Sequence, residues 1–449
     1  MLEQIRQCIK GKKVLILGFG KEGRSTYAYL QKAGGYRALG VADQNPVQVD
    51  RPDVECVTGP GYQEAAARYD IVFKSPGIVL KHQDPATLAK LTSQTDQFLR
   101  RFGGQTVGIT GTKGKSTTAS LLYHILRQTS PDCMLIGNIG VPALDMADQV
   151  GPHTQVVYEL SCHQLEYAAY SPHIAVLLNV FPEHLDHYGT YERYVAAKEQ
   201  IYRHQQEGDL LVCGAQCLPA PGTCRARLCS VSMDGEQADV MVTDRHTIRL
   251  AQRTLDFSGG LPHLIGKHNL YNVGVAYAVS QALGVPEDAF YQAVQSYRPL
   301  PHRLEYLGEV SGVRYYDDSI STIPETAMQA LESLQDVGTL ILGGMDRGIS
   351  YQPLLDFLAG YDLDNLVFLP QTGHDMYQTI QRERAAAFAD KTLQCAADLR
   401  EAVDIAKRLT APGKICLLSP AAASYGFFKN FEERGDYFRR YVMEPDGAQ

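Results

Sequence analysis

The sequence lacks the features that mark membrane-spanning, exported or nucleic-acid-binding proteins. No run of apolar residues reaches the roughly 18 that a bilayer-spanning helix needs. Residues 1–10 carry charges and lack the apolar core of a signal peptide. Positive charge does not predominate, because the formal net charge is −8, whereas a nucleic-acid partner favours a basic face. We therefore expect a cytoplasmic protein with no membrane partner and no nucleic-acid partner.

Paired C-x-x-C motifs are also missing, although the chain has ten cysteines. Four of them, Cys213, Cys217, Cys224 and Cys229, lie close together at spacings unlike those of a zinc ribbon. Because cytoplasmic thiols stay reduced, we interpret these four as half-buried free thiols on strands and turns. A structural metal held by the four cysteines is the alternative.

The length and the alternation of apolar segments predict the fold class. A chain of 449 residues exceeds one ordinary core, since domains hold roughly 100–200 residues, so we expect three domains. Short apolar strands alternate with helical stretches at 24–33, 116–127 and 269–283, which predicts an α/β fold with parallel sheets. The prolines at 299 and 301 indicate a linker. The expected strands are 12–17, 70–73, 107–110, 155–158, 174–178, 338–342, 366–368 and 414–418, with others within 209–262.

A glycine-rich loop, TGTKGKST at 110–117, stands between an expected strand and an expected helix. Backbone N–H groups in such a loop can face an anion, and the helix N-terminus adds its dipole. Lys115 is expected to reach the β- and γ-phosphates of ATP, and the hydroxyl of Ser116 or Thr117 to hold Mg²⁺. The loop departs from the strict phosphate-binding pattern, because no glycine stands at its first position. The alternative is an ordinary glycine turn capped by Ser116.

Polar residues also follow two further apolar strands. Ligands bind at the carboxyl ends of strands in open α/β sheets, so Glu159, His184 and His187 are candidates for one site. A buried carboxylate without a partner is costly, and Mg²⁺ at Glu159 removes that cost. The alternatives are a buried salt bridge for Glu159 and satisfied loop or core histidines. Lys198, judged from its helical surroundings alone, is a solvated lysine.

The amino-terminal glycine motif fits the dinucleotide fingerprint. It consists of Gly18, Gly20 and Gly23, with Asp43 twenty residues after the last glycine. Alone, the motif predicts NAD or FAD. A chain that already holds a nucleotide triphosphate can use this first fold for another anionic nucleotide. The glycines then face a pyrophosphate, and Asp43 bonds a base or a ribose.

Taken in order along the whole chain, the motifs resemble those of the muramyl ligase family, and within it the member that adds glutamate. Each motif is weak by itself, whereas the ordered set is specific. The set comprises TGTKGKS at 110–116, GNIG at 137–140, ELS at 159–161, EHLD at 183–186, Ala197-Lys198, GKHN at 266–269, LPHR at 300–303, Asp318-Ser319, Gly343-Gly344, LSP at 418–420 and KNFExRG at 429–435.

The resemblance implies an architecture and a reaction. The implied domains are a UDP-binding Rossmann-like domain over 1–98, a central ATPase domain over 99–299 and a glutamate-binding Rossmann-like domain over 300–449. The implied reaction is ATP-dependent ligation of glutamate, D-glutamate by default, to UDP-N-acetylmuramoyl-L-alanine during peptidoglycan precursor synthesis. The implied cofactors are ATP and two Mg²⁺ ions, and the family expectation is a monomer.

The resemblance also assigns roles to residues. Ser116 and Glu159 are implied to hold one Mg²⁺. His184 and Lys198 are implied to hold the second, with Lys198 carbamylated, because CO₂ on a neutral amine creates an anionic oxygen ligand. The implied catalytic residues are Lys115, Glu159, His184 and Lys198. ATP binding is implied for Gly111, Thr112, Lys113, Gly114, Lys115, Ser116, Thr117, Asn269, Asn272, Arg303 and Asp318. Substrate binding is implied for Gly18, Gly20, Gly23, Asp43, Ser75 and Gly77 at the UDP end, for Asn138 at the muramoyl group, and for Thr322, Arg347, Ser424 and Phe431 around glutamate.

Departures from the usual glutamate-adding pattern fall in the carboxy-terminal domain, which is implied to bind the amino acid. Ile320 and Arg347 stand where lysines are usual, and the tripeptide SYG at 424–426 is also unusual. These features favour a subtype that adds L-glutamate. Glutamate remains the expected substrate, since Arg347 can still clamp a carboxylate.

The implied mechanism transfers the γ-phosphoryl group of ATP to the alanyl carboxylate, which needs positioning and charge stabilisation more than covalent help. The acyl phosphate is then attacked by the glutamate amine, whose proton passes to His184 or to the carbamate. Three rival classes remain at this point. They are an NAD-dependent oxidoreductase that uses the first glycine loop, a phosphate-loop switch without ligase activity, and a folylpolyglutamate or meso-diaminopimelate ligase. The Asp-Asn-Pro-Arg motif of the dibasic amino-acid ligases is absent from the sequence.

Overall fold

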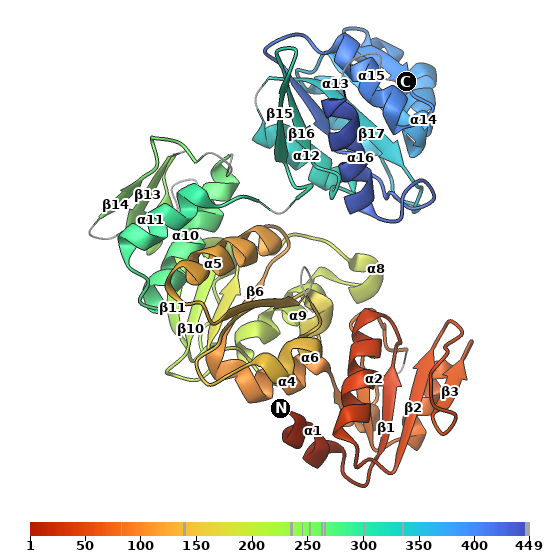
Figure 1. Cartoon of the computed structure of the whole chain (residues 1–449), viewed down its shortest axis with the longest axis vertical. Helices are drawn as coiled ribbons and strands as arrows, with labels where there is room; N and C mark the ends of the chain where they lie inside the picture. Colours follow the sequence, from red (N-terminus) through yellow and green to blue (C-terminus); the bar gives the residue numbers. More distant parts are fainter. Residues whose placement is uncertain are drawn as a thin grey trace. The chain divides into compact units, whose positions relative to one another are not determined.

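The structure is a computed structural model that describes residues 1–81, 83–137, 141–233, 237–244, 246–250, 253–261, 264, 266–299, 301–334 and 336–444. The chain forms two compact units, Met1–Gly260 with His268–Tyr297, and Leu261–Lys267 with Arg298–Gln449. Within the described ranges there are three sheets, of five, nine and six strands, flanked by helices (Figure 1). This confirms the predicted α/β class with mainly parallel sheets. No helix in these ranges is long and apolar enough to cross a bilayer.

The amino-terminal sheet is parallel throughout, with the order β3-β2-β1-β4-β5. Its central strand β1 is buried after its first residue, as expected for a parallel strand covered on both faces. Helix α2 follows β1 directly and lies beside the sheet in Figure 1. The elements are α1 (Leu2–Ile9), β1 (Lys13–Leu17), α2 (Lys21–Ala33), β2 (Ala38–Asp43), β3 (Glu55–Thr58), β4 (Ile71–Lys74), α3 (Pro85–Leu88), β5 (Leu91–Thr92) and α4 (Gln94–Phe102).

The central sheet has the order β14-β13-β12-β11-β10-β9-β6-β8-β7. Among the described strands of this sheet, only the pairings of β13 with β12 and β14 are antiparallel. Strand β6 lies between β9 and β8, so the strand order reverses there, which is where open α/β sheets bind ligands. The strands are β6 (Thr106–Thr110), β7 (Cys133–Gly137), β8 (Gln155–Glu159), β9 (Ile174–Leu177), β10 (Leu210–Gly214), β11 (Arg227–Met233), β12 (Val240–Val242), β13 (Thr247–Leu250) and β14 (Thr254–Asp256). The helices are α5 (Lys115–Thr129), α6 (Ala143–Met146), α7 (Cys162–Leu165), α8 (Leu185–Tyr188), α9 (Tyr191–Arg203), α10 (Lys267–Ala282) and α11 (Glu287–Ser296).

One continuous core joins these first two sheets. Val14 of β1, Phe98 of α4 and Tyr158 of β8 belong to the same buried cluster. Two hydrogen bonds from α2 reinforce the contact, since Ser25 donates to Asp145 at 2.6 Å and Tyr29 donates to Asp148 at 2.7 Å. The glycine loop before α2 is therefore fixed relative to the central sheet.

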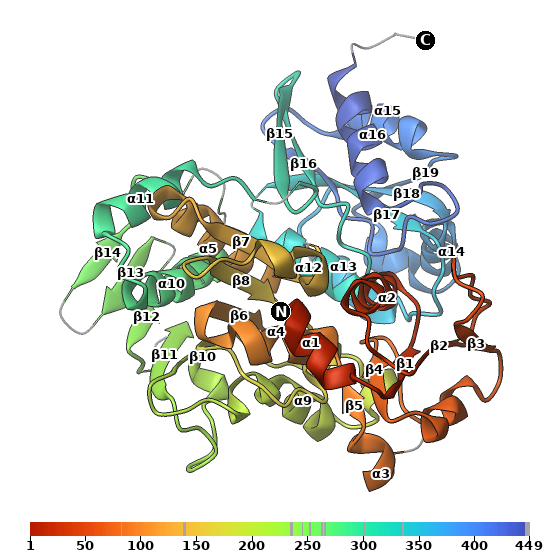
Figure 2. The same cartoon turned by 60° about the horizontal axis from the view of Figure 1, so that its bottom comes forward.

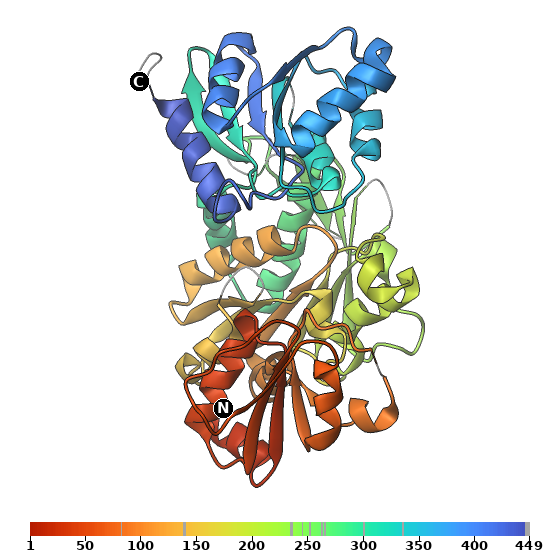
Figure 3. The same ribbon diagram turned by 90° about the vertical axis from the view of Figure 1, so that its right-hand side faces the viewer.

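The carboxy-terminal sheet, in the second unit, has the order β15-β16-β20-β17-β18-β19. Its one antiparallel pair within the described residues is the edge hairpin of β15 and β16 (Figure 2). Helices α12, α13 and α14 cover one face, and α15 and α16 cover the other (Figure 3). The elements are β15 (Glu305–Val310), β16 (Val313–Asp317), α12 (Pro324–Ser333), β17 (Val337–Gly344), α13 (Gln352–Gly360), β18 (Asn365–Gln371), α14 (Thr372–Thr379), β19 (Thr392–Cys395), α15 (Leu399–Leu409), β20 (Ile415–Leu418) and α16 (Phe431–Met443).

All eight strands predicted by their bounds are present, and no end shifts by more than three residues. Strand β18 extends furthest, to Gln371, and β17 continues through Gly343 and Gly344. These glycines have φ values of +114° and +153°, which side-chain-bearing residues rarely adopt, so a hydrophobicity pattern does not anticipate them. Separately, the four grouped cysteines are free, with Cys213 buried on β10 and the other three half-buried, as interpreted from the sequence.

Candidate active site

The phosphate loop connects β6 to α5 and is held by the strand beside it. Gly114 adopts φ +85° at the start of α5, and a Cβ on Gly111 would lie 2.8 Å from Cβ of Leu178. Asn179, just after β9, accepts hydrogen bonds from the backbone N–H groups of Thr112 at 2.9 Å and Lys113 at 2.8 Å. The loop therefore has the glycine-dependent, braced backbone of an anion cradle.

Lys115 lies folded over this cradle. Its Nζ donates to the carbonyl oxygens of Gly111 at 2.8 Å and Thr112 at 2.9 Å. An ammonium on a flexible stem at the N-terminus of a helix can instead turn toward a bound phosphate. The structure places the predicted phosphate-binding lysine at the loop, and its role stays a prediction.

A hydroxyl and a carboxylate meet beside the loop. Ser116 Oγ donates to Glu159 Oε1 at 3.2 Å, and Glu159 is fully buried at the end of β8. The sheet register sets Glu159 beside Ile109 of β6, which brings this carboxylate to the phosphate loop. Hard oxygen donors of these two kinds are the ligands that Mg²⁺ prefers. The residues present therefore fit the predicted metal.

Lys198 is buried, in contrast to the solvated lysine that its helical surroundings alone predict. On α9 it is 1% exposed, and its Nζ donates to the Gly111 carbonyl oxygen at 2.7 Å. The same nitrogen lies 4.8 Å from the centre of the Tyr194 ring. Burial, with the charge of Lys115 nearby, lowers the pKa of Lys198 to about 7. A large share of this amine is therefore neutral near pH 7, which is the form that reacts with CO₂.

His184 also lies near Tyr194. Its ring centre is 6.1 Å from that of Tyr194 and 4.9 Å from that of His163. Its φ of +57° is uncommon for a residue with a side chain and indicates a constrained loop. His187 is different, because it is half-buried and its Nε2 lies 3.2 Å from Glu166 Oε2. The structure thus brings His184 and Lys198 to one aromatic ring and gives His187 a structural partner.

Two asparagines of α10 reach the phosphate loop. A Cβ on Gly114 would lie 2.7 Å from Oδ1 of Asn272, and the same Oδ1 accepts from Thr118 at 3.2 Å. Asn272 donates in turn to Asn269 Oδ1 at 3.3 Å. Both predicted ATP-binding asparagines therefore lie at the nucleotide loop.

The amino-terminal glycine loop is tightly folded. Gly18 has φ +93°, and a Cβ on Gly23 would lie 2.1 Å from the Gly18 carbonyl oxygen, so both positions require glycine. The carboxylate of Asp43 accepts from Phe19 N at 2.7 Å, and Ser75 Oγ donates to the Gly18 carbonyl oxygen at 2.7 Å. Gly20 and Gly77 have open space where a Cβ would stand. The candidates for the UDP end thus meet at one loop. Asn138 lies outside the described residues.

A buried ion pair links this loop region to the central sheet. Lys74, which precedes Ser75, is 5% exposed at its side chain, and its Nζ lies 3.6 Å from Glu166 Oε2. The sequence prediction missed both residues, as it missed Asn179, Tyr194 and His163. The available signals were weak. Lys74 directly precedes Ser75, which the resemblance assigns to the UDP end, and Asn179 is a polar residue at a strand end.

In the second unit, Arg303 and Asp318 lie together. Asp318 is buried and accepts from Ser419 Oγ at 2.8 Å and from Leu304 N at 3.2 Å. Burial raises the pKa of Asp318 to about 6, although these hydrogen bonds and the Arg303 charge oppose the rise. The buried Nε of Arg303 has no hydrogen-bond acceptor within the described part of the chain. An unmatched buried donor of this kind is costly and is suited to a ligand.

The glutamate-side candidates come from the segments that follow β16, β17 and β20 and from the start of α16. Ser424 lines a cavity of about 210 Å³ together with Gly344 and Arg434. Met345 N donates to the Ala423 carbonyl oxygen at 2.8 Å, which brings the loop of Arg347 beside that of Ser424. Arg347 is exposed and Thr322 is half-buried. The carbonyl oxygen of Phe431 accepts from Ser319 Oγ at 2.8 Å. Their roles toward glutamate stay predictions.

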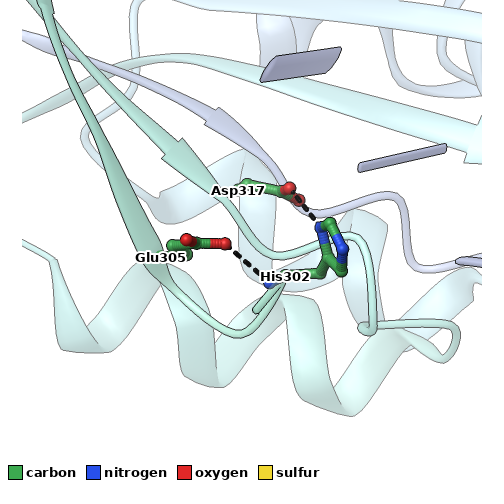
Figure 4. A group of neighbouring side chains, drawn as sticks. All are labelled: His302, Glu305 and Asp317. Carbon is green, nitrogen blue, oxygen red and sulfur yellow. Dashed lines mark hydrogen bonds and ion pairs between the residues drawn. The ribbon is translucent and has the colours of Figure 1, made fainter. Parts of the chain in front are cut away.

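His302 forms a buried cluster that the sequence prediction did not single out. Its Nδ1 lies 2.7 Å from Asp317 Oδ2, and its backbone N–H donates to Glu305 Oε2 at 3.0 Å (Figure 4). His302 is 4% exposed and Asp317 is fully buried. The only signal in the sequence was the presence of His302 in the quoted LPHR motif.

The comparisons with known proteins agree with this geometry. The Mur ligase middle domain family matches residues 109–280. The UDP-N-acetylmuramoylalanine–D-glutamate ligase of Acetivibrio thermocellus is 31% identical over 98% of both chains. The UDP-N-acetylmuramoyl-L-alanine–L-glutamate ligase of Salinispora tropica is 34% identical over 98% of this chain and 99% of its own. The crystal structure of MurF ligase from Thermotoga maritima in complex with ADP has a TM-score of 0.59 at 19% identity and covers 97% of this chain and 96% of its own.

The structural likeness shows the shared fold, and the sequence relatives show the family. The predicted resemblance is therefore confirmed, and none of these comparisons supports an NAD-dependent oxidoreductase. The chain belongs to the Mur ligase family and is an ATP-dependent amide-bond-forming ligase.

Proposed function

We propose that this ligase joins glutamate to UDP-N-acetylmuramoyl-L-alanine, with cleavage of ATP to ADP and phosphate, in peptidoglycan precursor synthesis. The observation that carries the proposal is the buried amine of Lys198, 2.7 Å from the Gly111 carbonyl of the phosphate loop. Relatives of nearly full coverage that are named as glutamate ligases supply the substrate class. We also assign the protein to the cytoplasm and expect it to act as a monomer.

ATP binds at the loop between β6 and α5 in this proposal. Backbone N–H groups of 111–117 and the ammonium of Lys115 hold the phosphates. Ser116 and Glu159 hold one Mg²⁺, and His184 with carbamylated Lys198 hold a second. When bound, Mg²⁺ neutralises charge on the transferred phosphoryl group. The neutral amine required for carbamylation is supported by the lowered pKa of Lys198.

The chemical steps follow from the poor reactivity of a carboxylate. The alanyl carboxylate attacks the γ-phosphorus of ATP, ADP leaves, and an acyl phosphate forms. The glutamate amine then attacks the acyl carbon, the tetrahedral oxyanion collapses, and phosphate leaves with its former carboxylate oxygen. Lys115 stabilises negative charge during phosphoryl transfer. The amine proton passes to His184 or to the carbamate.

The remaining candidates hold the ends of the substrates. The UDP group lies at the amino-terminal glycine loop with Asp43, Ser75 and Gly77, and Asn138 contacts the muramoyl group. Thr322, Arg347, Ser424 and Phe431 surround glutamate, with Arg347 as a partner for a carboxylate. Asn269, Asn272, Arg303 and Asp318 complete the ATP site. These assignments are supported by local contacts, since Ser75 bonds to Gly18 and Asn272 to Asn269 within the first unit, and Leu304 bonds to Asp318 within the second.

The stereochemistry of glutamate has two candidate answers. D-Glutamate is the default, supported by the Acetivibrio thermocellus relative. L-Glutamate is the second candidate, favoured by Ile320 and Arg347 in place of the usual lysines and by the Salinispora tropica relative.

The test is phosphate release from ATP and Mg²⁺ with UDP-N-acetylmuramoyl-L-alanine, comparing D-glutamate, L-glutamate and no amino acid. Release with D-glutamate alone establishes the default reaction, and release with L-glutamate alone establishes the second. Release with neither isomer contradicts the proposed substrate pair. Mass spectrometry of the nucleotide product confirms that a new amide has formed in the reactive case.

A further inference from the structure

A buried hydrogen-bonded cluster fixes the segment that carries Arg303. His302 and Leu304, on either side of Arg303, adopt φ values of +63° and +44°. Residues with side chains rarely occupy this left-handed region, so surrounding contacts must hold the segment there. The His302 ring provides the most buried of these contacts, through Nδ1 to Asp317 Oδ2 at 2.7 Å.

The same segment is joined to the loop after β16 by its backbone. The His302 carbonyl oxygen accepts from Ile320 N at 3.1 Å, and Leu304 N donates to Asp318 Oδ1 at 3.2 Å. Asp317 Oδ1 accepts in turn from Ser319 N at 2.9 Å. The His302–Asp317 contact therefore joins the two residues that directly precede Arg303 and Asp318, which are assigned to ATP.

Helix α16 packs against the cluster at Gly435. A Cβ on Gly435 would lie 2.1 Å from His302 Nδ1 and 2.5 Å from Asp317 Oδ2, so this position admits only glycine. Arg434, next to it, donates to Ser319 Oγ at 2.9 Å and to the Ser319 carbonyl oxygen at 2.8 Å. The packing leaves the imidazole little freedom to turn away from Asp317.

The contact of His302 with Asp317 is called the clamp below. The cluster around it is better suited to hydrogen bonding than to binding a metal. Ligand atoms of His302, Glu305 and Asp317 do lie within 4.8 Å of one another. Their oxygens are already engaged, because Glu305 Oε2 accepts from His302 N and Glu305 Oε1 pairs with Arg439 at 2.6 Å. Both Asp317 oxygens also accept hydrogen bonds, from His302 and from Ser319 N.

We propose that His302 is a positioning residue, whose contact with Asp317 holds Arg303 and Asp318 in the geometry that binds ATP. The inference rests on the proposed function, which assigns those two residues to ATP. His302 does not touch the nucleotide in this account. Its effect is on the apparent affinity for ATP, because a misplaced guanidinium loses its contact with the nucleotide.

The clamp also responds to pH. Burial alone would lower the pKa of His302, but the hydrogen bond and charge of Asp317, with the charges of Asp436 and Glu305, raise the pKa above its usual value. The charged imidazolium therefore persists to a higher pH than in the unfolded chain. The clamp is complete below the usual histidine pKa and weakens as the pH rises through the raised value.

The test compares KM for ATP and kcat in four variants of the full chain. His302→Ala removes the clamp, and we expect KM for ATP to rise about tenfold, as for loss of one charge-assisted hydrogen bond, with a smaller change in kcat. His302→Asn places an amide N–H where Nδ1 stood, and asparagine tolerates positive φ, so KM stays within about threefold of the parent value. Arg303→Ala tests the ATP contact itself, and exposed His246→Ala is the matched control.

The pH profile separates positioning from a purely structural role. The parent enzyme should lose kcat/KM for ATP on the alkaline side of the His302 titration, and His302→Asn should not lose it there. If His302→Ala fails to fold, the pH profiles of the parent and His302→Asn still test the positioning role. The positioning role alone is overturned if His302→Asn shows the same alkaline loss of kcat/KM as the parent. It is also overturned if His302→Ala keeps the parental KM for ATP while Arg303→Ala raises it. Parental KM in Arg303→Ala overturns the ATP assignment and, with it, the inference.

Discussion

Lys198 Nζ and the Gly111 carbonyl oxygen, 87 residues apart in the sequence, are joined by a 2.7 Å hydrogen bond. The bond holds a buried amine at the phosphate loop. With its pKa lowered to about 7, the neutral amine gains population as the pH rises through 7, whereas in the unfolded chain it stays charged. The position therefore suits an amine that is to be converted to an anionic ligand.

Lys198→Ala should lose about 100-fold or more in ligation rate, since it removes the lysine that we propose is carbamylated into an anionic group at the site of phosphoryl transfer. Added acetate or propionate should restore part of the rate by supplying a carboxylate in the vacated space. Ligation assays over a wide range of carboxylate concentration, with chloride at equal ionic strength as the control, measure this. An unrescued variant would count against the carbamate role.

Lys115→Ala should abolish ligation and leave the fold intact, because its Nζ bonds the carbonyl oxygens of Gly111 and Thr112 in this structure and is expected to stabilise the phosphates when ATP is bound. Phosphate release and thermal melting measure the two expectations. Arg127→Ala, which removes an exposed cation from the last turn of the same helix, is the matched control and should behave as the parent. Parental turnover in Lys115→Ala would remove the phosphate-loop assignment.

Asp96 on α4 should make stability depend on pH. Its side chain is 5% exposed, and burial raises its pKa to about 6, although the Ala169 N–H at 2.8 Å opposes the rise. Because the unfolded carboxyl ionises near pH 4, this group costs stability progressively between about pH 4 and pH 6, and the full cost persists above. Asp96→Asn should therefore stabilise the protein at pH 8 by on the order of 2 kcal/mol and have little effect at pH 4.

Thermal melting of parent and Asp96→Asn across this pH range is the measurement. The exposed Asp404→Asn variant is the control, because that side chain faces solvent in the folded chain. Equal destabilisation of Asp96→Asn at every pH would show that the carboxylate is needed for its hydrogen bond, contrary to this expectation.

The sequence was sufficient to predict those elements and site residues whose pattern lies within a short stretch of the chain. Eight strands are short apolar runs and were predicted close to their final bounds, as was the phosphate loop, a glycine-rich turn between a strand and a helix. Strands β3, β5, β7, β15, β16 and β19 were not predicted. Glu159 was a candidate because a carboxylate directly after an apolar strand needs a partner, and Ser116 is found beside it.

The contacts that the sequence did not predict join distant segments. The helical surroundings of Lys198 gave no sign that its side chain points at the phosphate loop, since that depends on how α9 packs against β6. Lys74 and Glu166 meet only because the first two sheets share a core. His302 and Asp317 meet because the hairpin of β15 and β16 folds its two ends together. The spacing of residues in the sequence does not predict such packing.

Oxygen transfer from the substrate carboxylate to phosphate tests the central claim most directly. UDP-N-acetylmuramoyl-L-alanine labelled with ¹⁸O in its alanyl carboxylate is turned over with ATP, Mg²⁺ and the accepted glutamate isomer, and the released phosphate is analysed by mass spectrometry. An acyl phosphate intermediate predicts one ¹⁸O in the phosphate for each new amide. Amide formation with unlabelled phosphate would contradict the proposed mechanism.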